Sequence, residues 1–222
     1  MIPSITDFEP MKTPTYFSKA ILALGGALMV TAAFAGNGRS GGDSTRTLDN
    51  TEAASIVFMR EEEKLARDVY QLLYTQWGRP IFNNIAASEQ QHMDAVGTLI
   101  TRYKLPDPAS HTGTGVFVDP ELQTLFNALM SHGQTSLNAA LQVGAAIEDL
   151  DIKDLNERIA QTDNPDVKLV YMNLLKGSRN HLRSFVSQLT AAGVSYTPQY
   201  ITQHRPGCAF LRCAMLVFTY LL

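Results

Sequence analysis

Four long stretches of the sequence have the apolar spacing of amphipathic helices, and each places acidic or histidine side chains on its apolar face. Apolar residues recur every three or four positions in these stretches, which is the period of a helix that packs on one side. Capping residues, glycine and proline mark their ends. The stretches are residues 51–77, 81–103, 135–161 and 164–192. This pattern predicts an all-α protein in which polar groups meet inside the helix packing.

The polar residues on the apolar faces are three glutamates and two histidines. They are Glu62, Glu89, His92, Glu148 and His181. Glu89 and His92 are one helical turn apart, so their side chains share a face and can bind one metal ion. Such a pair taken alone is also typical of a solvated helix surface. A buried carboxylate without a partner is costly, whereas a shared metal site satisfies all five groups, and we therefore predict that these residues bind metal.

The residue types narrow the choice of metal. Carboxylate oxygen and imidazole nitrogen together suit iron, manganese or zinc. Ferritin-like four-helix bundles bind two iron or manganese ions with one Glu from each of two helices and a Glu-x-x-His from each of the other two. The corresponding order in this chain is Glu62, Glu89-x-x-His92, Glu148 and Ser178-x-x-His181. We therefore expect iron, with two ions, and keep manganese and zinc as alternatives.

Ser178 stands where a complete site of this kind has its fourth glutamate. Asp151, one turn from Glu148, or a water molecule can take the place of that carboxylate. Two ions, one ion and a degenerate site without metal all remain compatible with this departure.

The segments around these residues have a recognisable local sequence. They are MREEEKLARDVY at 59–70, NIAASEQQHM at 84–93, GAAIEDLDI at 144–152 and GSRNHLR at 177–183. Together they resemble an uncharacterised ferritin-like family, the domain of unknown function 2202, over residues 48–203. The resemblance implies a ferritin-like four-helix bundle that binds metal, and the family brings no established reaction with it.

The helix pattern also predicts how several neighbouring residues lie. Glu61 and Glu63 fall outside or at the edge of the apolar stripe, so we expect them to be surface charges. Tyr70 and Tyr171 are expected to be core aromatics with bonded hydroxyls, with electron relay as the alternative. Asp151 begins a segment that resembles a second helix cap, which favours a break of the third long helix at that point.

A short extra helix is predicted in the connection between the second and third long helices. Residues 105–118 contain proline, glycine, serine and threonine throughout and predict a loop, in which His111 is solvated. Asp119 as cap, followed by Pro120 and Glu121, predicts a helix that ends at about residue 133. His132 then lies at the negative end of the helix dipole, which explains it better than a metal does.

Composition limits the function classes. The chain has 222 residues, 45% of them hydrophobic, and a formal net charge of −3, which fits one globular domain. No cluster of lysine and arginine with interleaved aromatics occurs, so we expect no nucleic-acid partner. Cys208 and Cys213 are the only cysteines, which leaves no disulfide framework for the body of the protein.

The two ends of the chain differ from the middle. Residues 1–35 have basic residues, an apolar run and a final small-x-small pattern, which predict a signal peptide and a periplasmic or secreted protein. A membrane anchor at residues 20–35 is the alternative. Residues 36–47 predict a flexible linker, and residues 204–222 form an atypical apolar tail. Membrane contact is expected only through the signal or this tail.

Two functional hypotheses follow. In the first, the protein is exported and its two-metal carboxylate site reacts with dioxygen or peroxide. In the second, it is a non-enzymatic envelope protein whose site is degenerate or holds a structural metal. Metal ions are the expected partners in the first case, and a homo-oligomer is compatible with both. A ferritin-type storage cage is less well supported, because the loop at 105–118 and the short extra helix do not form a cage pattern.

Overall fold

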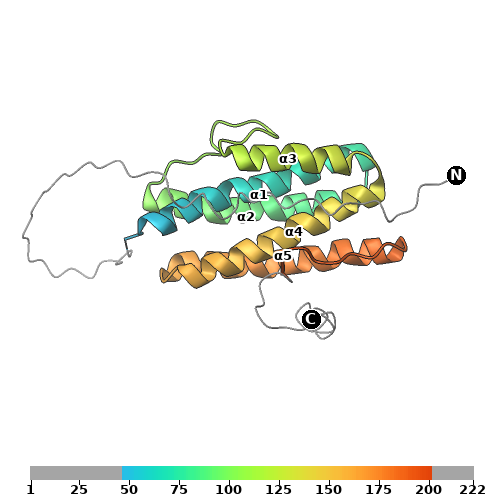
Figure 1. Cartoon of the computed structure of the whole chain (residues 1–222). Helices are drawn as coiled ribbons and strands as arrows, with labels where there is room; N and C mark the ends of the chain where they lie inside the picture. Colours follow the sequence, from blue (N-terminus) through green and yellow to red (C-terminus); the bar gives the residue numbers. More distant parts are fainter. Residues whose placement is uncertain (1–46, 202–222) are drawn as a thin grey trace, which may run out of the picture. The chain divides into compact units, whose positions relative to one another are not determined.

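The computed structural model describes residues 47–201, and every regular element in this range is an α-helix (Figure 1). The helices are α1 (Asn50–Trp77), α2 (Pro80–Tyr103), α3 (Pro120–Gly133), α4 (Leu137–Gln161) and α5 (Pro165–Ala191). The predicted all-α class is thus confirmed for the described residues. The predicted signal peptide, the linker up to residue 46 and the apolar tail lie outside them.

Local capping signals set most of the helix ends. Asp49 accepts a hydrogen bond from the backbone N–H of Glu52, and the Glu52 side chain accepts one from Asp49 in return, which makes a capping box at the start of α1. Asp119, Ser136 and Asn164 cap α3, α4 and α5 with their side chains. These caps explain why the helix bounds lie within one or two residues of the sequence prediction.

Helix α4 runs without interruption past Asp151, so the expected break is wrong. The Asp151 side chain accepts a hydrogen bond from Ser178 of α5, and Asp154 accepts one from Lys153 at 2.7 Å. An aspartate starts a helix only where its oxygen bonds a free backbone N–H. Both side chains bond to other side chains instead, and the helix continues.

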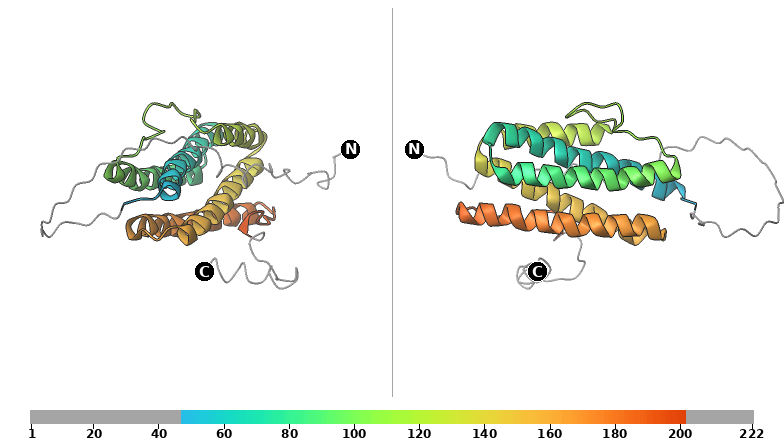
Figure 2. Two further views of the ribbon diagram at one scale, coloured as in Figure 1. Left: turned by 60° about the vertical axis from the view of Figure 1, so that its left-hand side comes forward. Right: turned by 180° about the vertical axis from the view of Figure 1, so that it is seen from behind.

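The long helices pack as two pairs. Helix α1 packs along α2, and α4 packs along α5, while the pairs contact each other through α2 with α5 and α1 with α4 (Figures 1 and 2). Helix α3 contacts α1 and α4. Large apolar and aromatic side chains with less than 2% exposure fill the interior, and they include Ile56, Met59, Leu73, Phe82, Leu155 and Phe185. Burial of one such side chain stabilises the fold by about 1.5–3 kcal/mol.

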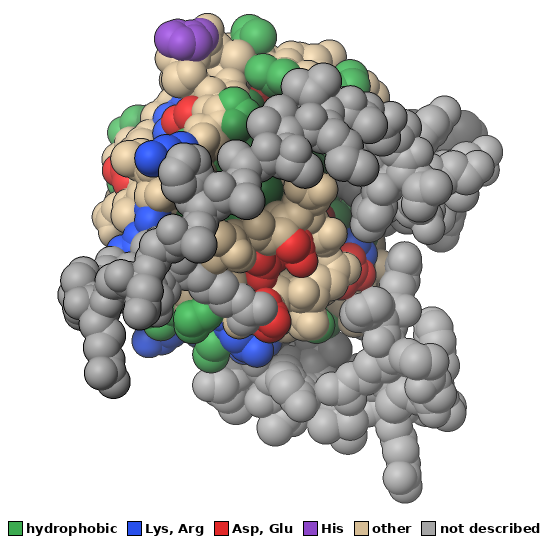
Figure 3. All heavy atoms as spheres, turned by 90° about the vertical axis from the view of Figure 1, so that its left-hand side faces the viewer, with side chains coloured by type: hydrophobic (Ala, Val, Ile, Leu, Met, Phe, Trp, Pro, Cys, Tyr) green, Lys and Arg blue, Asp and Glu red, His purple; other side chains and the backbone are tan. Residues whose placement is uncertain are grey.

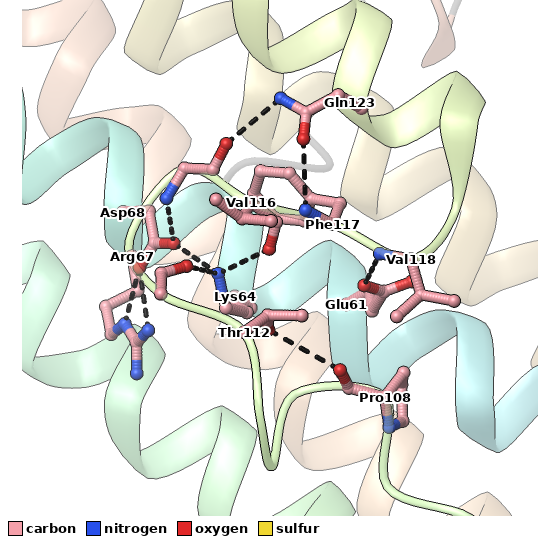
Figure 4. A network of polar contacts seen from close by, with 12 residues as sticks. Glu61, Lys64, Arg67, Asp68, Pro108, Thr112, Val116, Phe117, Val118 and Gln123 are labelled. Carbon is pink, nitrogen blue, oxygen red and sulfur yellow. Dashed lines mark hydrogen bonds and ion pairs between the residues drawn. The ribbon is translucent and has the colours of Figure 1, made fainter.

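The connection between α2 and α3 is fastened to α1 through a buried lysine (Figure 4). Lys64 is 1% exposed, and its Nζ donates hydrogen bonds to Asp68 Oδ2 at 2.6 Å, to the Gly113 carbonyl at 2.8 Å and to the Val116 carbonyl at 3.1 Å. An ammonium group has three protons, and all three have acceptors here. The burial of this charge is therefore compensated.

Glu61 belongs to the same contact region and is 3% exposed, so the expected surface position is wrong. Its carboxylate accepts the backbone N–H groups of Val118 at 2.6 Å and Asp119 at 2.9 Å (Figure 4). The connection that follows α2 covers this face of α1, which the periodicity of α1 alone does not show.

The surface drawn in Figure 3 carries acidic and basic side chains beside one another. An ion pair joins α2 to α5, where Arg102 Nη1 lies 2.6 Å from Asp166 Oδ2. Asn164, the cap of α5, donates to the Tyr103 hydroxyl at 3.0 Å. Within residues 47–201, no helix has the length and apolar character needed to cross a membrane.

The segment after α5 is anchored on α4 by Asp149. This aspartate is fully buried and accepts hydrogen bonds from the backbone N–H groups of Gln199, Tyr200 and Ile201 and from the Tyr196 hydroxyl. Burial raises the pKa of Asp149, and these donors partly offset the rise. These contacts hold the segment against α4.

Candidate metal centre

Four helices bring acidic and histidine side chains together in two groups that share one residue. The first group is Glu63, Glu89 and His92, and the second is Glu89, Glu148 and His181. Within each group the potential ligand atoms lie within 4.8 Å of one another. Glu63 comes from α1, Glu89 from α2 and Glu148 from α4. The helix packing therefore assembles the centre from residues far apart in the sequence.

Glu89 lies between the two histidines. His92 Nδ1 is 2.7 Å from Glu89 Oε2, and His181 Nδ1 is 2.7 Å from Glu89 Oε1. The two imidazole rings are stacked with their centroids 5.5 Å apart. A carboxylate with one oxygen toward each of two histidines has the arrangement of a bridge between two neighbouring sites.

The outer carboxylates complete each group. Glu63 Oε2 lies 3.2 Å from His92 Nδ1, and Glu148 Oε2 lies 3.5 Å from His181 Nδ1. The other ring nitrogen of His181, Nε2, hydrogen-bonds to Ser88 Oγ at 3.0 Å. Each histidine therefore turns Nδ1 toward the carboxylates.

Several of these atoms are buried without a hydrogen bond, and this tests whether the residues fit a metal. Glu63 Oε1, Glu89 Oε1 and His181 Nδ1 have no hydrogen-bond partner. Glu89 Oε1 and His181 Nδ1 are close together, but their directions are not those of a hydrogen bond. Buried polar atoms normally find partners, whereas atoms that bind one cation approach each other without bonding. The donor set of carboxylate oxygen and imidazole nitrogen fits iron, manganese or zinc.

Burial and mutual charge shift the pKa values of the group members. Burial raises the pKa of Glu89, but His181 and His92 outweigh it and lower the value to about 2. Burial lowers the pKa of both histidines, while Glu63 and Glu89 raise that of His92 to about 11, and Glu148 and Glu89 raise that of His181 to about 10. The carboxylates thus favour positive charge at the positions of both imidazoles.

The two outer carboxylates are shifted in the opposite direction. Burial raises the pKa of Glu63 to about 7, although His92 lowers it, and burial with the charge of Glu89 raises that of Glu148 to about 7. Buried carboxylates near one another repel, and a cation between them removes that cost.

Comparison with known proteins finds a matching family, a relative and a solved structure. The family described as an uncharacterized protein domain (DUF2202) matches residues 52–207. The chain belongs to this family. The uncharacterized protein MJ0754 of Methanocaldococcus jannaschii is 53% identical over 156 residues, which are 70% of this chain and 84% of that protein. The crystal structure of hypothetical protein MJ0754 from Methanococcus jannaschii matches with a TM-score of 0.69 and 52% identity, over 70% of this chain and 89% of the other.

The DUF2202 match contains all of the residues that were predicted to bind metal. Four of them, Glu89, His92, Glu148 and His181, lie in the two groups. Glu62 does not, and Glu63 is there instead. Glu63 is 2% exposed, so its expected surface position is wrong. Glu62 and Glu63 both lie one turn after the fully buried Met59, so helical spacing alone does not distinguish them.

Glu62 of this DUF2202 chain is buried outside the two groups. The residue is 5% exposed, and neither carboxylate oxygen has a hydrogen-bond partner. Burial raises its pKa well above the ordinary value, and the charges of Asp154 and Asp151 raise it further, while that of Arg158 lowers it. Glu62 therefore lies in an acidic region of α1 and α4 beside the two groups.

Tyr70 and Gly177 support the groups from outside. The Tyr70 hydroxyl donates to Glu148 Oε1 at 2.6 Å, so this core aromatic bonds directly to a candidate ligand. Tyr171 is also buried, but its hydroxyl bonds to Ser55 at 2.9 Å. A Cβ atom at position 177 would overlap Nε2 of His92, so the absence of a side chain at Gly177 makes room for that ring.

Proposed function

We propose that this DUF2202 protein is a ferritin-like protein with a two-metal carboxylate centre that reacts with dioxygen or peroxide. The observation that carries the proposal is the position of Glu89, whose two oxygens each face the Nδ1 atom of a different histidine. Iron is the preferred metal, with manganese or zinc as alternatives. Export from the cytoplasm is part of the proposal because residues 1–35 have the pattern of a signal peptide.

The helix arrangement supports the ferritin-like part of the proposal. Helices α1, α2, α4 and α5 are the four that contribute to the groups, and they pack as two pairs. Helix α3 contributes no residue to either group and would be the extra helix in the long connection. A centre built from inward side chains of four helices is the arrangement of ferritin-like carboxylate proteins.

Each residue has a role in this proposal. Glu63, His92 and one oxygen of Glu89 would hold the first ion, and Glu148, His181 and the other oxygen of Glu89 would hold the second. Two ferrous ions would supply two electrons, which with two protons are enough to reduce one hydrogen peroxide to two waters. Ser88 would accept the Nε2 proton of His181, which leaves Nδ1 free to bind. The apolar core around the groups would exclude bulk water.

Metal content is the first test. The full chain is loaded anaerobically with ferrous ion, desalted and analysed for bound metal, beside the Glu89→Gln variant and an Asp94→Asn control. Asp94 lies on the same helix as Glu89 but is exposed. Two ions in the wild type and the control, and none in the variant, are expected. An absence of metal in the wild type, or equal metal in the Glu89 variant, would overturn the proposal.

The second test separates an enzyme from a protein with a structural metal. Hydrogen peroxide is added to the ferrous-loaded protein, and the oxidation of the bound iron is measured as a change in the absorbance of the sample. The reactive centre predicts consumption of one peroxide for every two ions. A protein that holds its metal but oxidises it no faster than free ferrous ion would instead support the non-enzymatic alternative.

A further inference from the structure

The two groups contain three carboxylates, whereas a ferritin-like centre of the type described above has four. The missing position is occupied by Ser178, which is fully buried on α5. A serine hydroxyl has no charge and is a poor substitute for a carboxylate on a hard cation. If the centre holds two ions, its negative charge must be completed from another position.

Asp151 lies where it can complete this charge. It is on α4, three residues after Glu148, so both side chains point to the same face of that helix. It is 6% exposed. Its Oδ2 accepts the hydrogen bond of Ser178 Oγ, while its Oδ1 is buried and has no partner. The residue at the missing position thus holds a carboxylate that comes from the neighbouring helix.

The charges of the carboxylates in the two groups act on Asp151. After burial, the charges of Glu63 and Glu148 contribute most to the rise of its pKa, and Glu89 contributes as well. None of the ion pairs found among residues 47–201 includes Asp151. An unpaired buried carboxylate next to others is unfavourable unless a cation is shared.

Glu63 and Glu148 belong to different groups, and the charges of both raise the pKa of Asp151. It is not itself a member of either group of converging atoms. Its Oδ1 has no hydrogen-bond partner and is available to an ion, while Oδ2 accepts the hydrogen bond of Ser178.

We propose that Asp151 supplies the fourth carboxylate of the two-metal centre and that Ser178 is the positioning residue that holds it. This inference rests on the proposed function, because it assigns a further ligand to the same centre. A complete ferritin-like centre would have a glutamate on α5 at this position. Here an aspartate on α4 supplies the carboxylate, and the serine hydroxyl on α5 orients it.

The experiment measures binding of manganous ion, which is stable in air, to the full chain by calorimetry and elemental analysis. Asp151→Asn keeps the shape and the bond to Ser178 but removes the charge. We expect it to bind one ion with wild-type affinity and to lose the second, or to bind it more weakly by more than about 100-fold. Ser178→Ala is expected to lower the affinity for the second ion by about 10-fold, because it removes the hydrogen bond that orients Asp151.

The decisive variant moves the fourth carboxylate from α4 to α5. Asp151→Ser combined with Ser178→Glu returns the carboxylate to α5, and we expect it to bind two ions again. Asp154→Asn is the matched control, since this residue is equally buried on the same helix, and it should bind as the wild type does. Circular dichroism confirms that each variant is folded.

The outcomes distinguish this inference from the proposed function. A wild type that binds no metal contradicts the proposed function and removes the basis of the inference with it. A wild type that binds metal, with Asp151→Asn unchanged in stoichiometry and affinity, leaves the centre in place and overturns the role of Asp151. If Asp151→Asn does not fold, the exchanged double variant decides: recovery of two ions supports the inference, and failure to exceed one ion overturns it.

Discussion

Glu62 and Glu63 are adjacent on α1, yet their buried carboxylates enter different surroundings. Glu63 lies with Glu89 and His92, whereas Glu62 is in neither group, and burial and the charge of Asp154 raise its pKa. Successive residues on a helix are turned by about 100° from each other, so both can be buried while facing different neighbours.

Because Glu62 and Glu63 have different surroundings, their substitution is expected to affect metal binding differently. Glu63→Gln is expected to lose one metal ion, or to bind it more weakly by more than about 100-fold, because it removes a charged ligand. Glu62→Gln is the matched control and is expected to keep the wild-type count. Elemental analysis with calorimetry measures both, and equal losses in the two variants would contradict the assignment of Glu63.

Gly177→Ala tests the space beside His92. In the middle of a helix, alanine is favoured over glycine by about 1 kcal/mol, so the substitution would stabilise α5 if there were room. Because the new Cβ would overlap the His92 ring, we expect a loss of about 1–3 kcal/mol and weaker metal binding.

Gly113→Ala provides the comparison, since nothing lies within 4 Å of a Cβ built there. Urea unfolding of the two variants gives the difference in stability. A more stable Gly177→Ala protein with unchanged metal affinity would show that the ring does not need this space.

Tyr70→Phe removes the hydroxyl that bonds to Glu148. A hydrogen bond to a metal-binding carboxylate orients it, so we expect affinity for the ion at Glu148 to fall by about 10-fold or more. Tyr171→Phe removes an equally buried hydroxyl that bonds to Ser55, and its effect should be confined to stability, at about 1 kcal/mol. Metal titration separates the two effects, and similar affinities in both variants would count against a role for Tyr70.

Lys64→Met tests the fastening of the connection between α2 and α3. Asp68 keeps its ion pair with Arg67 at 2.7 Å, but the two backbone carbonyls bonded to Lys64 lose their donor, and we expect a cost of about 1–3 kcal/mol. Lys168→Met, at an exposed position on α5, should change stability by less than about 0.5 kcal/mol. Chemical denaturation compares them, and limited proteolysis at residues 108–118 should be faster only in the Lys64 variant.

Asp107 predicts a pH dependence at the start of the same connection. Burial raises its pKa, but the hydrogen bonds and charge of Arg60 outweigh burial and hold it below the ordinary value of 3.8. Because the pKa of Asp107 is lower in the folded chain than in the unfolded one, its ionised carboxylate stabilises the fold at pH values above the unfolded-state pKa. That contribution is lost as the pH falls through the folded value.

We therefore expect Asp107→Asn to be less stable than the wild type at about pH 6, with the difference shrinking as the pH falls below about 4. Urea unfolding across this range measures it. A difference that stays constant down to the lowest pH would mean that the charge of Asp107 is not the cause.

The sequence was sufficient for the helices because their ends depend on local chemistry. Asp49, Asp119 and Asn164 bond backbone groups two or three residues away, and such contacts are visible in the order of residues. The break expected at Asp151 failed for the opposite reason. Its partner, Ser178, is distant in sequence, and only the packing of α4 on α5 brings the two together.

The candidate centre was predicted in outline but not in detail. Glu89, His92, Glu148 and His181 stand on helix faces that periodicity identifies well. The choice between Glu62 and Glu63 depends on how far α1 is rotated about its axis, which the apolar stripe does not resolve to one residue. The burial of Glu61 depends on a connection that crosses α1, and no pattern within α1 itself predicts that cover.

The two groups take residues from the first described helix, α1, and from the last, α5. A growing chain therefore has no complete centre until the residues up to His181 have been synthesised and packed on the earlier helices. An ion held by the second group, Glu89, Glu148 and His181, can therefore be captured only after α5 has packed, from the solution in which folding is completed. With the proposed export, that solution would lie outside the cytoplasm, and its metal supply would decide which ion the second group carries.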